Sequence, residues 1–208
     1  SFSDIDTSKP LFVVANEFLD ALPIAQVIKK NDKIHEVGIV CDPEFSMVVG
    51  NEITEAVDAY GALPEGAIFE IPHAAVRMLE DMTACLGSTQ HLHFLFIDYG
   101  YFDTPLTSTL QAIHKHKKVD VLSNIGEADV TSLVNFPAIA SALEKLGFTV
   151  DLATQAAFLQ EMGIEQRAER LASNNPERQA QIRQDLERLI GKNHMGELFK
   201  VLVARRIS

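Results

Sequence analysis

Two apolar runs, each followed closely by acidic residues, constrain the fold of this chain more than any other feature. The run at residues 11–15 reads LFVVA and precedes Glu17 and Asp20, and the run at residues 92–97 reads LHFLFI and precedes Asp98. Apolar runs without regular polar alternation are typical of strands buried on both faces of a parallel sheet. The sequence therefore predicts an α/β fold in which both runs are strands and the acids follow their carboxyl ends.

The segment between the two runs supports a parallel arrangement. Residues 73–86 carry apolar side chains near helical spacing, and Gly87 follows as a helix C-cap. A helix between two strands of one sheet makes a right-handed crossover, which joins parallel strands. Ligands bind beyond the carboxyl ends of strands in such sheets, so the acids are candidates for a functional site.

Local patterns predict the remaining elements. Residues 24–50 are expected to form a small antiparallel β insertion, with strands at 24–29, 33–40 and 45–50 and a turn at Asn31-Asp32. Residues 51–67 and 124–136 are expected to be loops, the first with room for a short helix. Further helices are expected within 105–117 and over 137–146, 155–163, 164–174 and 175–191, and strands at 148–154 and 197–206. A single α/β domain would then span residues 1–208.

Charge and composition exclude several classes of function. The chain has 29 acidic and 18 basic residues, a net charge of -11, which disfavours nucleic-acid binding and suits a cationic partner. No segment approaches the roughly 20 apolar residues of a membrane span, and no signal peptide opens the chain, so we expect a soluble intracellular protein.

Cysteines and histidines do not form a metal-binding pattern. Cys41 and Cys85 lack metal-type spacing and are expected to be reduced, mostly buried thiols. His91 and His93 would share a strand face, whereas a helix at 105–117 would separate the side chains of the histidines at 114 and 116. We therefore expect no metal ion. A glycine-rich nucleotide-binding turn is also missing from these 208 residues, so a nucleotide-like cofactor would need a segment before Ser1.

Seven motifs in order resemble one known family. The segments ANEFLDALP, FEIPHAA, FIDYGY, TLQAIHKH, GEADVTSLVNF, TQAAFLQEMGIEQRAERL and MGELFKVL follow one another as in the MidA-like S-adenosylmethionine-dependent methyltransferases. That family includes a mitochondrial assembly factor that methylates an arginine on a respiratory complex I subunit. The resemblance extends from Leu11 to Leu202.

The resemblance implies a partial Rossmann-like, class I methyltransferase fold, of which this chain is the C-terminal portion. The N-terminal half, which would hold much of the cofactor, would precede Ser1. The implied cofactor is S-adenosylmethionine, and the implied partner is a protein substrate, with a complex I subunit as one candidate. It is compatible with a homodimer, and it implies a cytoplasmic location or, in a eukaryote, the mitochondrial matrix.

The resemblance also assigns roles to particular residues. Glu17 and Asp20 would be catalytic, since two carboxylates can hold a planar guanidinium through its fork of donors. Asn16 and Glu17 would lie beside the methionine part of the cofactor. Asp98, Tyr99 and Gln155 would contact the substrate, and Gly163 and Arg167 match the same motif as Gln155.

Each assignment has a structural alternative. Glu17 or Asp20 could cap the start of a helix, and Asp98 could be a buried acid that accepts main-chain hydrogen bonds in the Tyr99-Gly100 turn. Tyr99, Tyr101, Gln155, Gly163 and Arg167 could serve packing alone.

Two positions depart from the family pattern. Leu133 stands where the family often has a polar residue, and Asn135 stands where it commonly has an acid, in a loop that could close over the target arginine. The alternative functions are a non-catalytic assembly or binding protein with the same fold, and a small-molecule methyltransferase. The β insertion at 24–50 favours a large partner over a small molecule.

Overall fold

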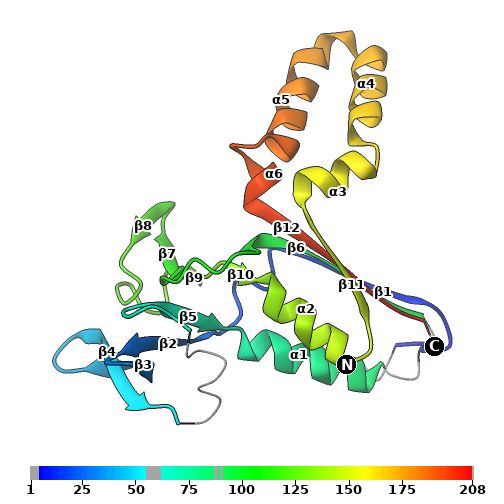
Figure 1. Ribbon diagram of the computed structural model, residues 1–208. Helices are drawn as coiled ribbons and strands as arrows, with labels where there is room; N and C mark the ends of the chain where they lie inside the picture. The colour runs from blue at the N-terminus through cyan, green and yellow to red at the C-terminus, as the bar shows by residue number, and fades with distance from the viewer. Residues whose placement is uncertain (1–4, 55–61, 87–88, 90, 208) are drawn as a thin grey trace.

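A mixed sheet forms the centre of the computed structural model, which describes residues 5–54, 62–86, 89 and 91–207 (Figure 1). Strand β1 (Leu11–Asn16) pairs in parallel with β6 (His91–Tyr101), in a register that runs from Leu11 opposite Leu92 to Asn16 opposite Ile97. The predicted parallel pair is thereby confirmed. The carboxyl ends of both strands lie at the same edge of the sheet. Glu17 and Asp20 follow β1 as expected, whereas Asp98 does not follow its strand, because β6 continues to Tyr101 by pairing with β10 and β12.

Three further strands complete this sheet. Strand β12 (Phe199–Ile207) runs antiparallel to β6 on the side away from β1, and β11 (Thr149–Thr154) runs antiparallel to β12. The short strand β10 (Val134–Asn135) pairs in parallel with Gly100 and Tyr101 at the carboxyl end of β6. The predicted strand at 148–154 is confirmed, and two short strands, β10 and β9, lie in the segment 124–136 that was expected to be loop.

One face of the sheet carries the hydrophobic core. Helices α1 (His73–Cys85) and α2 (Phe136–Lys145) both pack on this face, as Figure 1 shows. Both helices were predicted, although Gly87, the expected C-cap, lies outside the described residues. The fully buried side chains of this core come from β6, β12 and both helices: Leu79, Leu86, Leu92, Phe94, Phe96, Phe136, Ile139, Leu143 and Leu202.

The opposite face of the sheet is open at β1. Phe12 and Val14 point to this face and are 72% and 63% exposed, and the Phe12 ring stacks on His93 at 4.6 Å between centroids. The expectation that the first strand is buried on both faces is therefore wrong for the described chain. The reason is that α1 and α2 both cover the other face, and β1 has no second neighbouring strand here. The result is an exposed apolar surface at the β1 edge of the sheet.

The predicted β insertion is present as an antiparallel sheet beside the main one. Its strands are β2 (Ala25–Lys30), β3 (Lys33–Cys41), β4 (Phe45–Glu52) and β5 (Ile68–Ile71), in the order β4-β3-β2-β5. Asn31 and Asp32 both have positive φ, 53° and 58°, as a two-residue hairpin turn requires. Strand β5 was not predicted, and residues 55–61 of the expected loop lie outside the described residues.

The helix expected within residues 105–117 is wrong. This segment contains β7 (Gln111–His114) and the start of β8 (Lys117–Val119), and β9 (Asp129–Thr131) pairs with the other side of β7. Lys115 and His116 have φ of 50° and 63° and form the hairpin turn, which ends any helical run. Pairing with β9, which is distant in sequence, stabilises the extended conformation, and a local pattern does not reveal such a partner.

A group of helices extends from the carboxyl end of β11, away from α1 and α2 (Figure 1). Its members are α3 (Gln155–Glu161), α4 (Ile164–Asn174), a 3-10 turn at Pro176–Arg178, α5 (Gln179–Ile190) and α6 (Met195–Leu198). The helices expected over 155–191 are confirmed, with Pro176 ahead of α5 and Gly191 after it. The last strand begins at Phe199, two residues later than expected, because α6 takes up the residues before it.

The surface of the chain corrects one further expectation. Cys41 and Cys85 are both free thiols as expected, but both are exposed rather than buried.

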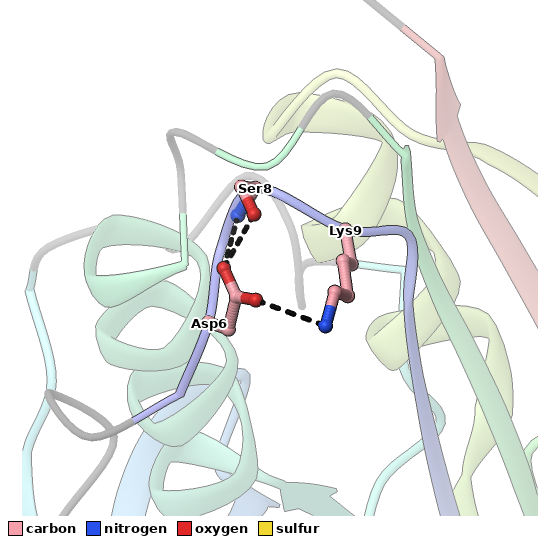
Figure 2. Close-up of polar contacts among 3 residues, drawn as sticks. All are labelled: Asp6, Ser8 and Lys9. Atoms are coloured by element: carbon pink, nitrogen blue, oxygen red, sulfur yellow. Dashed lines mark hydrogen bonds and ion pairs between the residues drawn. The ribbon is translucent and has the colours of Figure 1, made fainter.

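A polar turn precedes β1. Figure 2 shows Asp6 accepting hydrogen bonds from the main-chain N–H and hydroxyl of Ser8 and forming an ion pair with Lys9. Within the described residues, none of the helices has the length and apolar character that a membrane span requires.

Gly100 allows β10 to approach β6 closely. A β-carbon at this position would lie 2.5 Å from the carbonyl oxygen of Val134 and 2.6 Å from the ring of Phe136. Both neighbours are held firmly, one as a strand backbone and the other as a fully buried side chain. Any larger residue must therefore push β10 and the start of α2 away from the sheet.

We predict that Gly100→Ala lowers the free energy of unfolding by about 1–3 kcal/mol, the usual cost of overpacking. Gly38→Ala is the matched control, since a β-carbon there would meet only Val48 at 3.7 Å; we expect a change within about 0.5 kcal/mol. Urea unfolding of the full-length gene product measures both. Equal midpoints for Gly100→Ala and the wild type would contradict the close approach of β10.

Candidate functional site

The loop after β1 is held by the side chain of Asp98 at the end of β6. Oδ2 of Asp98 accepts hydrogen bonds from the main-chain N–H groups of Phe18, Leu19 and Asp20, at 3.0, 2.8 and 3.2 Å. Oδ1 accepts from the N–H of Tyr99 at 2.9 Å. The Asp98 side chain is only 1% exposed, so these N–H groups replace water around its carboxylate. Asp98 is thus a buried acid with main-chain donors, but Tyr99 and Gly100 continue β6 instead of forming the expected turn, and three of the four donors come from the loop. A role of Asp98 in substrate binding stays a prediction.

The loop itself, residues 17–24, has no regular secondary structure. Glu17 has φ of 48°, which is unusual for a residue with a side chain, and its N–H donates to the carbonyl of Ile97 at 3.0 Å. In this described segment no helix begins at Glu17 or Asp20, so the helix-capping alternative for these acids is wrong. Their carboxylates must serve some other purpose than a helix dipole.

The acids gather around Tyr99. The side chain of Glu17 is exposed and accepts a hydrogen bond from the Asn16 amide at 3.1 Å. Main-chain bonds bring the acids together, because Asp98 accepts from the N–H groups of Asp20 and Tyr99 and the N–H of Glu17 donates to Ile97. Burial first, and then the carboxylates of Glu17, Asp20 and Asp98, raise the pKa of Tyr99. The Tyr99 ring packs on Phe199 with 4.0 Å between centroids. The structure therefore brings together Asn16, Glu17, Asp20, Asp98 and Tyr99, five of the six residues that the sequence nominated.

Burial makes two of these carboxylates weaker acids. Loss of solvent raises the pKa of Asp98 to about 6, and the neighbouring Asp20 carboxylate adds to this effect, although the main-chain N–H bonds act in the opposite direction. Burial also raises the pKa of half-buried Asp20, and the charge of Glu17 contributes in the same direction. A cation near these groups would relieve their mutual repulsion, which makes the site suited to a positively charged ligand.

Gln155 has different surroundings. It lies at the start of α3, it is buried, and its side-chain amide donates to the carbonyl of Leu189 in α5 at 2.9 Å. That bond joins two helices and does not lead to the acidic loop. Gly163, with φ of 79°, forms the turn before α4, and the N–H of Arg167 donates to its carbonyl. The contacts of these residues are those of helix packing, and a role in substrate binding for Gln155 stays a prediction.

Sequence reasoning missed a polar network centred on Glu70 in β5. Glu70 is only 3% exposed, and its carboxylate accepts hydrogen bonds from the Gln26 amide and from the N–H and hydroxyl of Thr109. The Thr109 hydroxyl accepts from the N–H of Leu133, and the Asn135 amide faces the carbonyl of Glu70 at 3.4 Å. Glu70 lies within the motif FEIPHAA, and an acid inside a short strand was the available signal.

The same network explains one of the departures from the family pattern. Asn135 accepts a hydrogen bond from the N–H of Ala138 and so caps α2, while its amide group can donate toward Glu70. An ionised acid could cap the helix but could not donate. The same segment contacts the acidic loop, because the N–H of Ser132 donates to the carbonyl of Asp20 at 3.0 Å. The segment that contains Leu133 and Asn135 is therefore adjacent to the candidate site.

Five cavities among the described residues have linings that do not include Glu17, Asp20, Asp98 or Tyr99. Groups of three or more His, Cys, Asp or Glu side chains that could hold a metal ion do not occur in the described part of the chain.

Comparison with known proteins agrees with these features. A family model described as S-adenosyl-L-methionine-dependent methyltransferase matches residues 2–154. The chain is 30% identical over 199 residues to a protein of Xenopus tropicalis named protein arginine methyltransferase NDUFAF7, mitochondrial, with 91% of this chain and 45% of that protein covered. A Drosophila melanogaster homolog of the same name is 31% identical over 205 residues, with 91% and 46% covered. The chain thus spans about half the length of these curated relatives.

Solved structures show the same fold. A structure from Burkholderia thailandensis, with S-adenosyl-homocysteine bound, superimposes with a TM-score of 0.83 at 26% identity, covering 97% of this chain and 55% of the other. S-adenosyl-homocysteine is the product that S-adenosylmethionine leaves after methyl transfer. The expected class I methyltransferase fold is confirmed, and the family's cofactor is S-adenosylmethionine. The chain belongs to the MidA-like family of S-adenosylmethionine-dependent methyltransferases.

Proposed function

We propose that the protein containing this chain transfers a methyl group from S-adenosylmethionine to an arginine of a protein substrate. The observation that carries this proposal is the position of Glu17 and Asp20 at the carboxyl edge of the sheet, where Ile97 binds the main chain of Glu17 and Asp98 binds that of Asp20. The names of the NDUFAF7 relatives, as protein arginine methyltransferases, support it. The half of those proteins that this chain does not match would hold the remainder of the cofactor.

In this proposal Glu17 and Asp20 orient the target guanidinium. Two carboxylates can accept hydrogen bonds from separate nitrogens of its planar fork, which turns the third nitrogen toward the reacting methyl group. When bound, the cofactor supplies an electrophilic methyl group on a sulfonium. The attacking nitrogen gains this methyl group and loses one proton, which a carboxylate of the pair can accept. Asn16 and Glu17 would also hold the ammonium group of the cofactor's methionine part.

An apolar groove supports a protein as the substrate rather than a small molecule. The groove measures about 400 Å³ and lies between the β2–β5 sheet and the segment around β9. Ile39, Phe45, Met47, Ile125 and Val130 line it and are each at least 40% exposed. An exposed apolar surface of this kind suits contact with another protein chain. The proposal also includes a complex I subunit as the target protein and a homodimer as the assembly. It includes a location in the cytoplasm or, in a eukaryote, in the mitochondrial matrix.

The proposed roles predict different effects of two neutralising substitutions. We expect Asp20→Asn to bind S-adenosylmethionine as the wild type does and to lose most methyl transfer, because Asp20 contacts only the guanidinium. Loss of a charged hydrogen bond made in the transition state costs about 100-fold or more in turnover. Glu17→Gln should weaken both cofactor binding and transfer. Calorimetry and transfer of radiolabelled methyl groups to arginine measure the two effects in the full-length gene product.

Glu80→Gln and Asp81→Asn serve as matched controls for this experiment. Both residues are exposed on α1, on the far side of the core from the open face, so both variants should behave as the wild type does. Unchanged turnover in Glu17→Gln and Asp20→Asn would remove both acids from the mechanism. Cofactor binding without any methyl transfer by the wild-type protein would favour a non-catalytic binding protein.

The titration of Asp98, which binds the main chain of Asp20, affects the stability of the folded protein. Its pKa is about 6 in the folded protein, against an ordinary value of 3.8. At pH values between 3.8 and about 6, the Asp98 carboxyl keeps its proton in the folded protein and has lost it in the unfolded chain. The stability that this proton contributes is complete below about pH 3.8 and is lost as the pH rises through about 6.

We therefore predict that the wild type loses stability relative to Asp98→Asn as the pH rises from 3.8 to about 6. The slope approaches about 1.4 kcal/mol per pH unit if one proton is involved. Urea unfolding of both proteins across this pH range measures the difference in unfolding free energy. If the wild type instead gains stability relative to Asp98→Asn as the pH rises, the main-chain hydrogen bonds lower the pKa of Asp98.

A further inference from the structure

We propose that Asp98 is a positioning residue, whose carboxylate fixes the loop that carries Glu17 and Asp20 and so sets the place of the Asp20 side chain. This inference rests on the proposed function, because it concerns the same site. It gives Asp98 a different task from the direct substrate contact that the sequence suggested. Asp98 acts through the main chain of the loop rather than on the reacting groups.

Three consecutive N–H groups converge on one oxygen atom. The donors are Phe18, Leu19 and Asp20, and the acceptor is Oδ2 of Asp98, 78 to 80 residues away in sequence. An anionic acceptor suits such a cluster, since hydrogen bonds to a charged group are about twice as strong as neutral ones. The other oxygen bonds to the N–H of Tyr99, which fixes the orientation of the carboxylate.

The loop depends on these bonds because it has few others. The other main-chain bonds that the structure gives it are Glu17 N–H to Ile97, Leu22 N–H to Leu19, and Ser132 N–H to Asp20. None of these uses the N–H groups of residues 18–20. Leu19 is buried in the core and Leu22 packs against it, whereas Phe18 is exposed. Packing therefore holds the loop at its leucines, and the bonds to Asp98 hold the main chain on either side of Leu19. Without Asp98 the main chain at Asp20 would lose its direct link to β6.

Burial separates the task of Asp98 from that of Asp20 and Glu17. Asp98 is 1% exposed, whereas the Glu17 side chain is exposed and Asp20 is half-buried. A substrate could reach the latter two without moving the loop, but it could reach Asp98 only by displacing the N–H groups that surround it. The hydrogen bond of Glu17 N–H to Ile97 does not involve Asp98, so the start of the loop has its own attachment.

The Asp98→Asn variant of the full-length gene product tests this assignment. The amide keeps the shape of the side chain but leaves only one acceptor oxygen for the four N–H groups and turns an NH₂ donor toward some of them. We expect turnover to fall about 100-fold, the cost of a misplacement near 1 Å. The dissociation constant of S-adenosylmethionine should change less than about threefold, since a small difference in binding free energy corresponds to such a change. The control Asp81→Asn should match the wild type in both measurements.

A double-mutant cycle separates positioning from an independent contact. If Asp98 acts through Asp20, the variant Asp98→Asn/Asp20→Asn should be no more than about threefold slower than Asp20→Asn alone, because residues that act as a unit are not additive. Multiplied losses would assign Asp98 an independent role and overturn the inference. Full activity of Asp98→Asn, alongside inactive Asp20→Asn, would also overturn it. Full activity of Asp20→Asn would instead overturn the proposed function, and this inference with it.

Hydrogen exchange provides a measurement that does not depend on activity. In the wild type, the Leu19 amide should exchange far more slowly than an unstructured peptide, and in Asp98→Asn its protection should fall about tenfold or more. Amides in the centre of β6, such as those of Leu95 and Phe96, should keep their protection in both proteins. If Asp98→Asn does not fold, the wild-type measurement alone decides: exchange of Leu19 at the rate of an unstructured peptide overturns the inference.

Discussion

A buried carboxylate joins the two strands on which the candidate site depends. Asp98 lies within β6, three residues before its end, and through the N–H groups of Phe18, Leu19 and Asp20 it holds the loop that follows β1. The parallel pairing of β1 with β6 brings these two ends to one edge, and the hydrogen bonds then fix the loop there. The loop has no helix or strand of its own, so the position of half-buried Asp20 depends on that side chain, whereas exposed Glu17 has its own main-chain bond to Ile97.

The surroundings of this edge account for the rest of the architecture. The Glu70 network ties β5 to the loop that contains Leu133 and Asn135, and the N–H of Ser132 connects that loop to the carbonyl of Asp20. Two small antiparallel sheets therefore lie beside the acids and offer an apolar groove between them. The opposite face of the main sheet is open at Phe12 and Val14. The chain spans about half the length of its curated relatives.

Local sequence patterns predicted strands at the apolar runs 11–15 and 92–97 and the helix between them, because long apolar runs and helical spacing depend little on distant partners. The second strand extends to Tyr101 in the structure. They failed at 105–117, where β7 is extended through pairing with β9. They also failed for Cys41 and Cys85, whose exposure depends on tertiary packing. The acids after each strand were found by position alone. The convergence of three N–H groups on Asp98 was not, since it joins residues about 80 apart and needs the fold to be known.

The most direct test of this account is a crystal structure of the full-length protein with S-adenosyl-homocysteine and an arginine-containing peptide bound. The account predicts carboxylate oxygens of Glu17 and Asp20 about 3 Å from the guanidinium nitrogens, with Asp98 still bonded to the main chain of the loop. An arginine bound away from both acids would contradict the central claim. So would a direct contact between the guanidinium and Asp98 that displaces the loop.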